Sequence, residues 1–331
     1  MARSDVTGFF SDTPTAASTL SLRSLQSAVF WLDDPARPAA MAPLGGRIVC
    51  DLLVVGGGFS GLWSALLAKE ADPGRDVVLL EASRIADAAT GRNGGFVSPS
   101  LTHGIRNGAQ RWPADLGTLL RLGHENLDAI EATIARLGID CDFRRSGEIT
   151  VAVQDYQVGE LREAAQCAAG YGEAVDFLDG ERMRARVHSA SYLGASTDQA
   201  VALVNPARLA WGLLEACQAS GVRVFEHSPV LGLTDDGSEV TATTAQGRVV
   251  ARRVAVATNA FPAIVRQAAK YVVPVYDYVL MTEPLSVGQW SSIGWHGREG
   301  IGDAGNQFHY YRPTADGRIL WGGYDAVYHR G

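Results

Sequence analysis

Three glycines at fixed spacing are the first residues in this sequence whose type and order indicate chemistry. Gly56, Gly58 and Gly61 form a G-x-G-x-x-G motif directly after the apolar run 51–55. The first glycine permits a tight turn, the second lets the backbone approach a pyrophosphate, and the third lets a helix pack closely on the preceding strand. The N–H groups at the start of that helix would face the phosphates. We therefore interpret this stretch as a dinucleotide-binding turn.

A carboxylate follows at the distance that such a turn requires. Glu81 lies about 20 residues after Gly61 and closes a second apolar run, 76–81. There it can accept a hydrogen bond from a ribose hydroxyl, and it would repel a ribose 2′-phosphate, which disfavours NADP. The alternative is a glycine-rich turn in another kind of α/β protein. The motif alone does not distinguish NAD from FAD.

The elements around the motif form a βαβ unit. Residues 51–55 and 76–81 are short and apolar, as buried parallel strands are, and 61–69 carry apolar residues at helical spacing. The crossover between the two strands is expected to be right-handed.

The stretch after Glu81 favours FAD over NAD. A plain NAD domain would continue with a third strand, but here a loop contains TGRNGG at 90–95, and the sheet resumes only at 255–260. Paired glycines let the backbone approach a flat ligand, and Arg92 and Asn93 supply donors.

Further along the chain, helical patterns occupy 114–138, 157–172 and 205–221, and strand patterns occupy 147–153, 222–234, 239–260, 271–283 and 306–323. Helices and strands alternate early in the chain, and strands of a mixed sheet dominate later. This order predicts an α/β nucleotide-binding domain interrupted by an α+β domain. Residues 1–48 are rich in Ser, Thr, Ala and Pro, and we expect an extended arm with local order near Phe30 and Trp31.

The sequence resembles the FAD-dependent amine and amino-acid oxidases related to D-amino-acid oxidase, glycine oxidase and monomeric sarcosine oxidase, and it looks closest to the gamma-glutamylputrescine-oxidase-like branch. The segments that carry the resemblance are VVGGGFSG (54–61), VVLLEA (77–82), TGRNGGF (90–96), VNPARLAWGL (204–213) and VAVATNA (254–260).

This resemblance implies a Rossmann-like FAD-binding domain with an interrupted parallel sheet and an inserted α+β substrate domain. The FAD-binding domain would comprise 49–105 and 205–265, and the substrate domain 106–204 and 266–331. It implies oxidation of an amine by hydride transfer to FAD, with O2 reoxidising the flavin to give H2O2. The residues implied to contact FAD are Gly56, Gly58, Phe59, Ser60, Gly61, Glu81, Ala82, Thr90, Arg92, Asn93, Gly94, Gly95, Val230, Thr258 and Asn259.

Residues that face the substrate are harder to assign. In the run 308–312, strand alternation places His309 and Tyr311 on one face, and this pair is a candidate for lining the substrate site. Tyr276 is a further candidate. The alternative is that these residues belong to a sheet of the substrate domain with one solvated face.

Composition excludes several other classes of function. The formal net charge of −7 over 331 residues gives no electrostatic reason to expect nucleic acid or an anionic membrane as partner. The 4 cysteines are widely spaced, which argues against a disulfide framework and a zinc site. Neither a signal peptide nor a transmembrane run is present, so we expect a cytoplasmic protein whose partners are a small amine and O2.

Two other interpretations stay open. One is an NAD-dependent dehydrogenase with the same glycine motif. The other is a non-catalytic fragment of an FAD fold. Oxidases of this family close the FAD-binding domain with a later strand, glycine turn and helix, whereas after Arg312 only 318–321 is strand-like. The sequence therefore predicts that the closing segment is missing.

Overall fold

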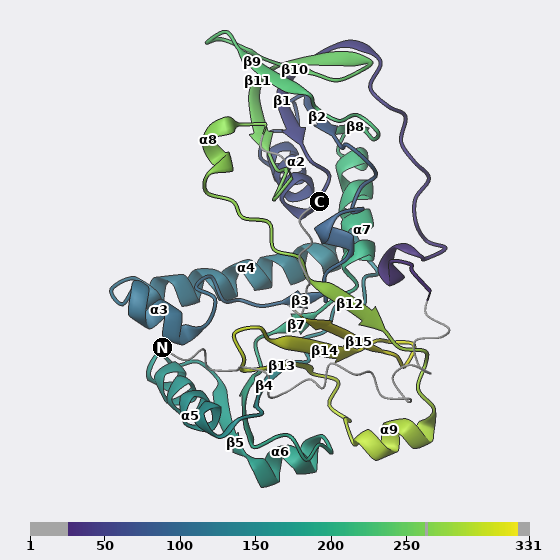
Figure 1. Ribbon diagram of the computed structural model, residues 1–331. Helices are drawn as coiled ribbons and strands as arrows, with labels where there is room; N and C mark the ends of the chain where they lie inside the picture. Colours follow the sequence, from purple (N-terminus) through teal and green to yellow (C-terminus); the bar gives the residue numbers. More distant parts are fainter. Residues whose placement is uncertain (1–25, 262–263, 324–331) are drawn as a thin grey trace, which may run out of the picture.

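The computed structural model describes residues 26–261 and 264–323. Within these ranges the strands form a six-stranded sheet, a seven-stranded sheet and a two-stranded ribbon. Figure 1 shows the six-stranded sheet above the seven-stranded sheet, with helix α4 (Leu116–Leu137) running between them. The predicted tail 320–331 lies mostly outside the described residues, as do residues 1–25 of the predicted arm.

The six-stranded sheet has the order β8-β2-β1-β11-β10-β9. Its first four strands are parallel, and the last two form an antiparallel extension. All residues of β2 are buried, because an inner parallel strand is covered on both faces. In chain order the strands are β1 (Gly46–Val55), β2 (Val77–Leu80), β8 (Arg223–Phe225), β9 (Gly232–Asp235), β10 (Val240–Thr243) and β11 (Gly247–Val256).

Two helices cover one face of this sheet. Helices α2 (Phe59–Ala71) and α7 (Pro206–Ala219) pack against each other and share a core that includes Leu62, Leu66 and Leu213. Asn205 caps α7, since its side chain accepts the N–H of Arg208 at 3.1 Å, and a proline follows at the first helical position. The Asn-Pro start predicted from sequence is therefore confirmed.

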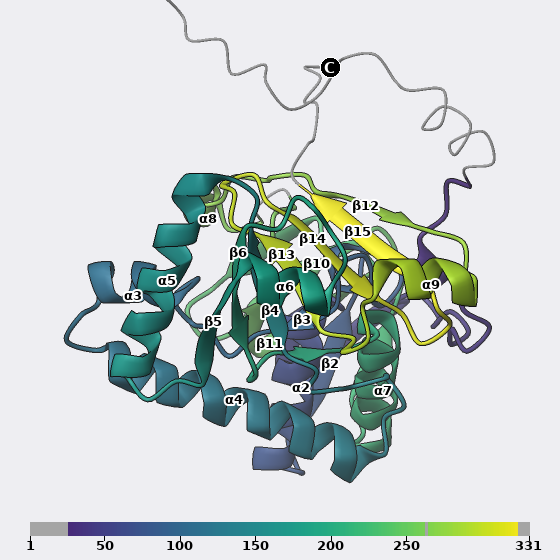
Figure 2. The same ribbon diagram turned by 90° about the horizontal axis from the view of Figure 1, so that it is seen from below.

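The seven-stranded sheet has the order β12-β15-β14-β13-β4-β6-β5. One of its faces packs on α6 (Gly180–Arg186) and α9 (Val287–Ile293), which lie toward the viewer in Figure 2. Its strands are β4 (Glu148–Ala152), β5 (Val175–Asp179), β6 (Gly194–Asp198), β12 (Tyr278–Met281), β13 (Gly300–Asp303), β14 (His309–Pro313) and β15 (Ile319–Gly323).

The remaining elements lie outside the two large sheets. The ribbon pairs β3 with β7, and α3 contacts α5. These elements are η1 (Phe30–Leu32), η2 (Ala89–Gly91), β3 (Phe96–Val97), α3 (Ile105–Arg111), α5 (Asp155–Gly170), β7 (Ala202–Leu203) and α8 (Arg266–Ala269).

One expectation about the elements needs correction. The predicted strand 271–283 is extended only at β12, and Tyr276 precedes that strand. Ile134, near the end of α4, packs in the core that α2 and α7 share. The local order expected near Phe30 and Trp31 is confirmed by η1, and both Trp31 and Leu44 are buried. The division into two domains itself stays a prediction.

Candidate cofactor-binding site

The turn between β1 and α2 has the geometry expected of the glycine motif. Gly56 has φ +113°, and a Cβ there would lie 2.4 Å from the carbonyl oxygen of Ala257. A Cβ on Gly61 would lie 1.9 Å from the carbonyl oxygen of Gly56. Only glycine permits the first backbone conformation, and only glycine permits the helix to approach the strand this closely.

The start of α2 is suited to an anion. Gly58 provides no capping side chain, and the first turn, which includes Phe59, Ser60 and Gly61, has no acidic residue. The Phe59 N–H donates to Thr90 Oγ1 at 3.2 Å, so the predicted loop residue lies at this helix end. Gly58 leaves the other N–H groups of this turn without a capping side chain, and these groups and the positive end of the helix dipole favour a phosphate.

Glu81 links the end of β2 to the same turn. Its Oε2 accepts the N–H of Gly57 at 2.6 Å, and its Oε1 accepts the N–H of Ser83 at 2.8 Å. The carboxylate is half-buried, and Ala82 beside it is exposed. The predicted partner of a ribose hydroxyl therefore lies directly beside the glycine turn.

Three further predicted residues lie at the same edge of the sheet. The Ser228 N–H donates to the Glu81 carbonyl at 2.8 Å, which brings the segment leading to Val230 to the end of β2. The Ala257 N–H donates to the Val55 carbonyl at 2.8 Å, so Thr258 and Asn259 follow beside the turn. This edge carries the carboxyl ends of the parallel strands, where open α/β sheets bind ligands.

The segment between β2 and β3 (residues 81–95, the β2–β3 loop) is folded by its own side chains. Asn93 donates from Nδ2 to the Thr90 carbonyl at 2.7 Å and accepts the Gly95 N–H at 2.8 Å. Arg92 donates from Nε to the Asp87 carbonyl at 2.6 Å and is exposed. Asn93 thus shapes the loop, a role that sequence reasoning did not assign to it.

Arg312 on β14 holds the end of this loop against the seven-stranded sheet. Its side chain is buried, and Nη1 donates to the carbonyls of Gly95 at 3.1 Å and Val204 at 2.7 Å. Burial lowers the pKa of Arg312 to about 10. The β14 residue Tyr310 lies beside Gly94, where a Cβ would be 2.5 Å from its ring.

Two of the three substrate candidates, Tyr311 and His309, lie on the other face of β14. Tyr311 is buried in the core under the seven-stranded sheet, bonds to the hydroxyl of Tyr192 at 2.6 Å and stacks on Trp321. His309 bonds to Asp303 at 2.9 Å, and Tyr276 is exposed. The face of β14 that meets the loop is the opposite one. Alternation identified both faces but not which of them meets the loop.

Comparison with known proteins agrees with this geometry. Residues 51–331 match the family model described as FAD dependent oxidoreductase, DAO. The chain belongs to this family. Sequence relatives include gamma-glutamylputrescine oxidoreductase of Escherichia coli K12, at 37% identity over 280 residues, which cover 83% of this chain and 65% of that protein. Another is the probable oxidoreductase OrdL of Haemophilus influenzae, at 29% identity over 281 residues, covering 82% and 64%. The chain thus spans less than two thirds of the length of these two relatives.

Solved structures of other proteins share the fold. Glycine oxidase from Geobacillus kaustophilus matches with a TM-score of 0.67 at 20% identity, covering 83% of this chain and 71% of that one. L-proline dehydrogenase from P. horikoshii matches with a TM-score of 0.65 at 16% identity, covering 86% and 71%. The DAO family depends on FAD, so the expectation of FAD is confirmed and an NAD-dependent dehydrogenase is disfavoured.

Neither a metal-binding cluster nor a membrane-spanning helix is found among the described residues. Residues 26–261 and 264–323 contain no group of three or more His, Cys, Asp or Glu that could hold a metal ion. The same part of the chain has no helix long and apolar enough to cross a membrane.

Proposed function

We propose that the protein is an FAD-dependent oxidoreductase that oxidises the C–N bond of a small amine or amino acid, with O2 as the final electron acceptor. One observation carries this proposal: a single loop joins the two halves of the site. Thr90 of the β2–β3 loop contacts the start of α2, and Gly95 at its end is held by Arg312 of the seven-stranded sheet. A group bound at the glycine turn can therefore extend toward that sheet.

This chain's own residues would hold the cofactor. The glycine turn and the N–H groups that open α2 would bind the pyrophosphate, and Glu81 would bind a ribose hydroxyl. The backbone at Gly94 and Gly95 would let the loop approach a flat ring. The fit is supported by the missing cap on α2 and by the close approach at Gly61.

Bound FAD would supply the two-electron acceptor for the C–H bond next to the amine nitrogen. In the balanced reaction, one amine, one O2 and one water give a carbonyl compound, a released amine or ammonia, and H2O2. The substrate is oxidised by two electrons, O2 is reduced by two, and the oxygen of water enters the carbonyl product.

The face of the seven-stranded sheet that meets the loop suits a cationic amine. Gly302 pairs with both Thr150 and Tyr310, which places Glu148, two residues before Thr150 on β4, on the same face as Tyr310. Glu148 also pairs with Asp198 on β6. Burial first, and the Asp198 carboxylate second, raise the pKa of Glu148 to about 7. An aromatic ring and a perturbed carboxylate beside a cofactor loop are groups expected to bind an ammonium.

The test is cofactor uptake followed by amine oxidation. The protein is incubated with FAD, and amines are added without air while flavin absorbance is followed; H2O2 is measured after air is admitted. The panel contains an N-acylated diamine, an N-methylated amino acid and glycine. We expect bleaching of the flavin by at least one amine, and H2O2 on aeration. Absence of bound flavin, or formation of NADH from NAD with the same amines, would overturn the proposal.

A further inference from the structure

The N-terminal arm (residues 26–45) runs along the outside of the β2–β3 loop in the opposite direction. Near its start, Trp31 Nε1 donates to the Asn93 carbonyl at 2.9 Å, at the far end of the loop. Further on, Arg37 forms an ion pair with Asp87 in the middle of the loop. The arm and the loop therefore run antiparallel to each other and lie side by side.

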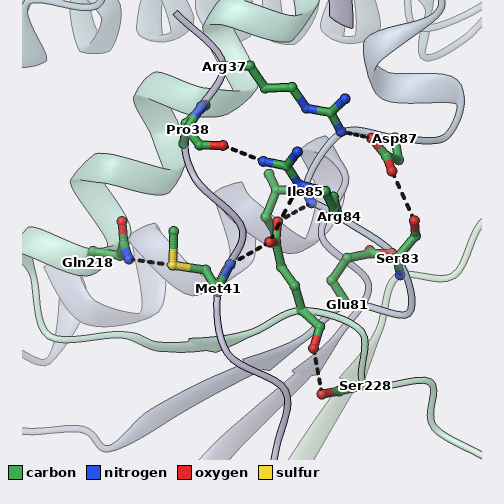
Figure 3. A network of polar contacts seen from close by, with 11 residues as sticks. Arg37, Pro38, Met41, Glu81, Ser83, Arg84, Ile85, Asp87, Gln218 and Ser228 are labelled. Carbon is green, nitrogen blue, oxygen red and sulfur yellow. Dashed lines mark hydrogen bonds and ion pairs between the residues drawn. The ribbon is translucent and has the colours of Figure 1, made fainter.

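The contact continues to the beginning of the loop. Arg84 donates to the Pro38 carbonyl, as Figure 3 shows. Met41 meets the loop through the Glu226 side chain. Glu226 Oε2 accepts the Met41 N–H at 2.7 Å, and its Oε1 accepts the Ile85 N–H at 2.7 Å. One carboxylate thus bridges the arm, the loop and the segment after β8.

Glu226 bridges these segments from a buried position. The residue is 2% exposed, and the nearest cation is Arg84, whose Nε lies 3.8 Å from Oε2. Hydrogen bonds to a carboxylate shielded from water are stronger than those between neutral groups. A glutamine at this position would replace one carboxylate oxygen by an NH2 donor, so either the Met41 or the Ile85 N–H would lose its acceptor, which is costly.

The arm is also anchored in the core. Trp31 is 5% exposed and Leu44 is 1% exposed, and the guanidinium of Arg312 lies 5.6 Å from the centre of the Trp31 ring. The Leu44 N–H donates to Ser228 Oγ at 2.8 Å. The arm therefore has fixed points beside both ends of the loop, although it precedes the region 51–331 that the family model matches.

Two of the predicted cofactor contacts, Thr90 and Glu81, face the glycine turn. Thr90 Oγ1 points to the Phe59 N–H, and the Glu81 carboxylate points to the Gly57 N–H, both in the glycine turn. The arm bonds instead to Asn93, Asp87 and Arg84 of the loop. Its effect on a bound cofactor would therefore act through the shape of the loop.

We propose that the N-terminal arm is a clamp that holds the β2–β3 loop in the conformation that binds FAD, with Trp31 and Glu226 as positioning residues at its two ends. A loop ordered before binding loses less conformational entropy when the ligand arrives, so the clamp raises FAD affinity without touching FAD. This inference rests on the proposed function only in taking FAD as the ligand.

The test uses two conservative variants of the full chain. Trp31→Phe keeps the aromatic ring and removes the Nε1–H donor, and Glu226→Gln keeps the shape and removes the charge. Matched controls are Trp112→Phe and Glu239→Gln, both exposed in the structure. The readouts are the FAD dissociation constant, from quenching of flavin fluorescence, and the rate of tryptic cleavage in the FAD-free chain. Cleavage is followed after Arg84 and Arg92 in the loop, with cleavage after Arg298, outside it, as internal reference.

We expect Glu226→Gln to weaken FAD binding by about tenfold, the factor that corresponds to loss of about one buried charge-assisted hydrogen bond. Trp31→Phe should weaken it by about threefold to tenfold. Both should speed cleavage in the loop relative to Arg298, and added FAD should suppress the excess cleavage.

Unchanged loop cleavage and unchanged FAD affinity in both variants would overturn the clamp. If Glu226→Gln does not fold, Trp31→Phe decides by the same two measurements. If the parent chain takes up no FAD, the proposed function fails, while the cleavage rates of the FAD-free variants still decide whether the arm orders the loop.

Discussion

Glu148→Gln should stabilise the protein in a pH-dependent way. Glu148 lies opposite Asp198 across β4 and β6, and burial raises its pKa from 4.5 to about 7. The folded state therefore keeps the Glu148 carboxyl group protonated over a pH range in which the unfolded chain has released that proton. Stability from this group is fully present below about pH 4.5 and is lost as the pH rises through about 7.

The size of the effect follows from the shift. At about 1.36 kcal/mol for each pKa unit, the displacement from 4.5 to about 7 corresponds to at most about 3 kcal/mol of lost stability at pH 8. An unfolding entropy of roughly 2.1 cal/mol/K for each of the 331 residues converts this to about 4 °C in Tm. The neutral amide removes the charge, so the variant should not suffer this loss.

The assay is thermal unfolding followed by circular dichroism at pH 5 and pH 8. Glu163→Gln, on the exposed side of α5, controls for removal of a surface carboxylate. We expect Glu148→Gln to gain up to about 4 °C over the parent at pH 8 and clearly less at pH 5. An equal difference at both pH values, or a larger gain at pH 5, would refute the assignment of a raised pKa.

Further predictions concern packing and reactivity. Gly61→Ala should abolish FAD binding and lower the free energy of unfolding by several kcal/mol, because the new Cβ would lie 1.9 Å from a backbone oxygen. Gly159→Ala in α5, where a Cβ would have nothing within 4 Å, should raise the free energy of unfolding by about 0.5–1 kcal/mol, as measured by urea unfolding. Tyr311→Phe should cost about 1 kcal/mol, because it breaks the buried 2.6 Å hydrogen bond to Tyr192, and should leave FAD affinity unchanged in a fluorescence titration. Cys167 should be the one thiol that reacts rapidly with an aromatic disulfide reagent in the native protein, because the other three thiols are buried. Burial raises the pKa of Cys50 to about 12, that of Cys141 to about 11 and that of Cys217 to about 12. Rapid release of more than one equivalent of thiolate would contradict that expectation.

The glycine turn could be predicted because its physical causes are local. A strand, a turn with one glycine at positive φ and a closely packed helix are all specified between Asp51 and Ala71. Glu81 follows within the same βαβ unit, so its distance from the turn is set by the length of one helix and one strand. Such short-range constraints are visible in a sequence without any knowledge of the tertiary fold.

The substrate side could not be predicted in the same way. Alternation on β14 separates Tyr311 from Tyr310 and Arg312, but both sets contain aromatic residues, so polarity did not show which face meets the loop. Helices α6 and α9 decide which face of β14 is left to meet the loop, because they cover the Tyr311 face. The sequence patterns of these two helices were not identified. Glu148 was missed because its position is defined only by pairing with β6 and β13.

The arm was missed as a functional element for a related reason. Its prolines and small residues indicate an extended segment, and that description is locally adequate. Its partners, however, are far along the chain: 185 positions separate Met41 from Glu226, and 184 separate Leu44 from Ser228. No local pattern reveals a bond of that range.

This separation in sequence also determines when the site can form during synthesis. A ribosome adds about 5–20 residues each second, so Met41 waits on the order of 10–40 s before its acceptor at Glu226 has been made. β1 waits longer for β11, its parallel neighbour at 247–256. Met41 therefore cannot reach its native place until β8 and the residue that follows it have been made. Until then the strands beside the arm have unpaired edges, and a nascent chain of this kind is expected to need protection from association before it can take up its cofactor.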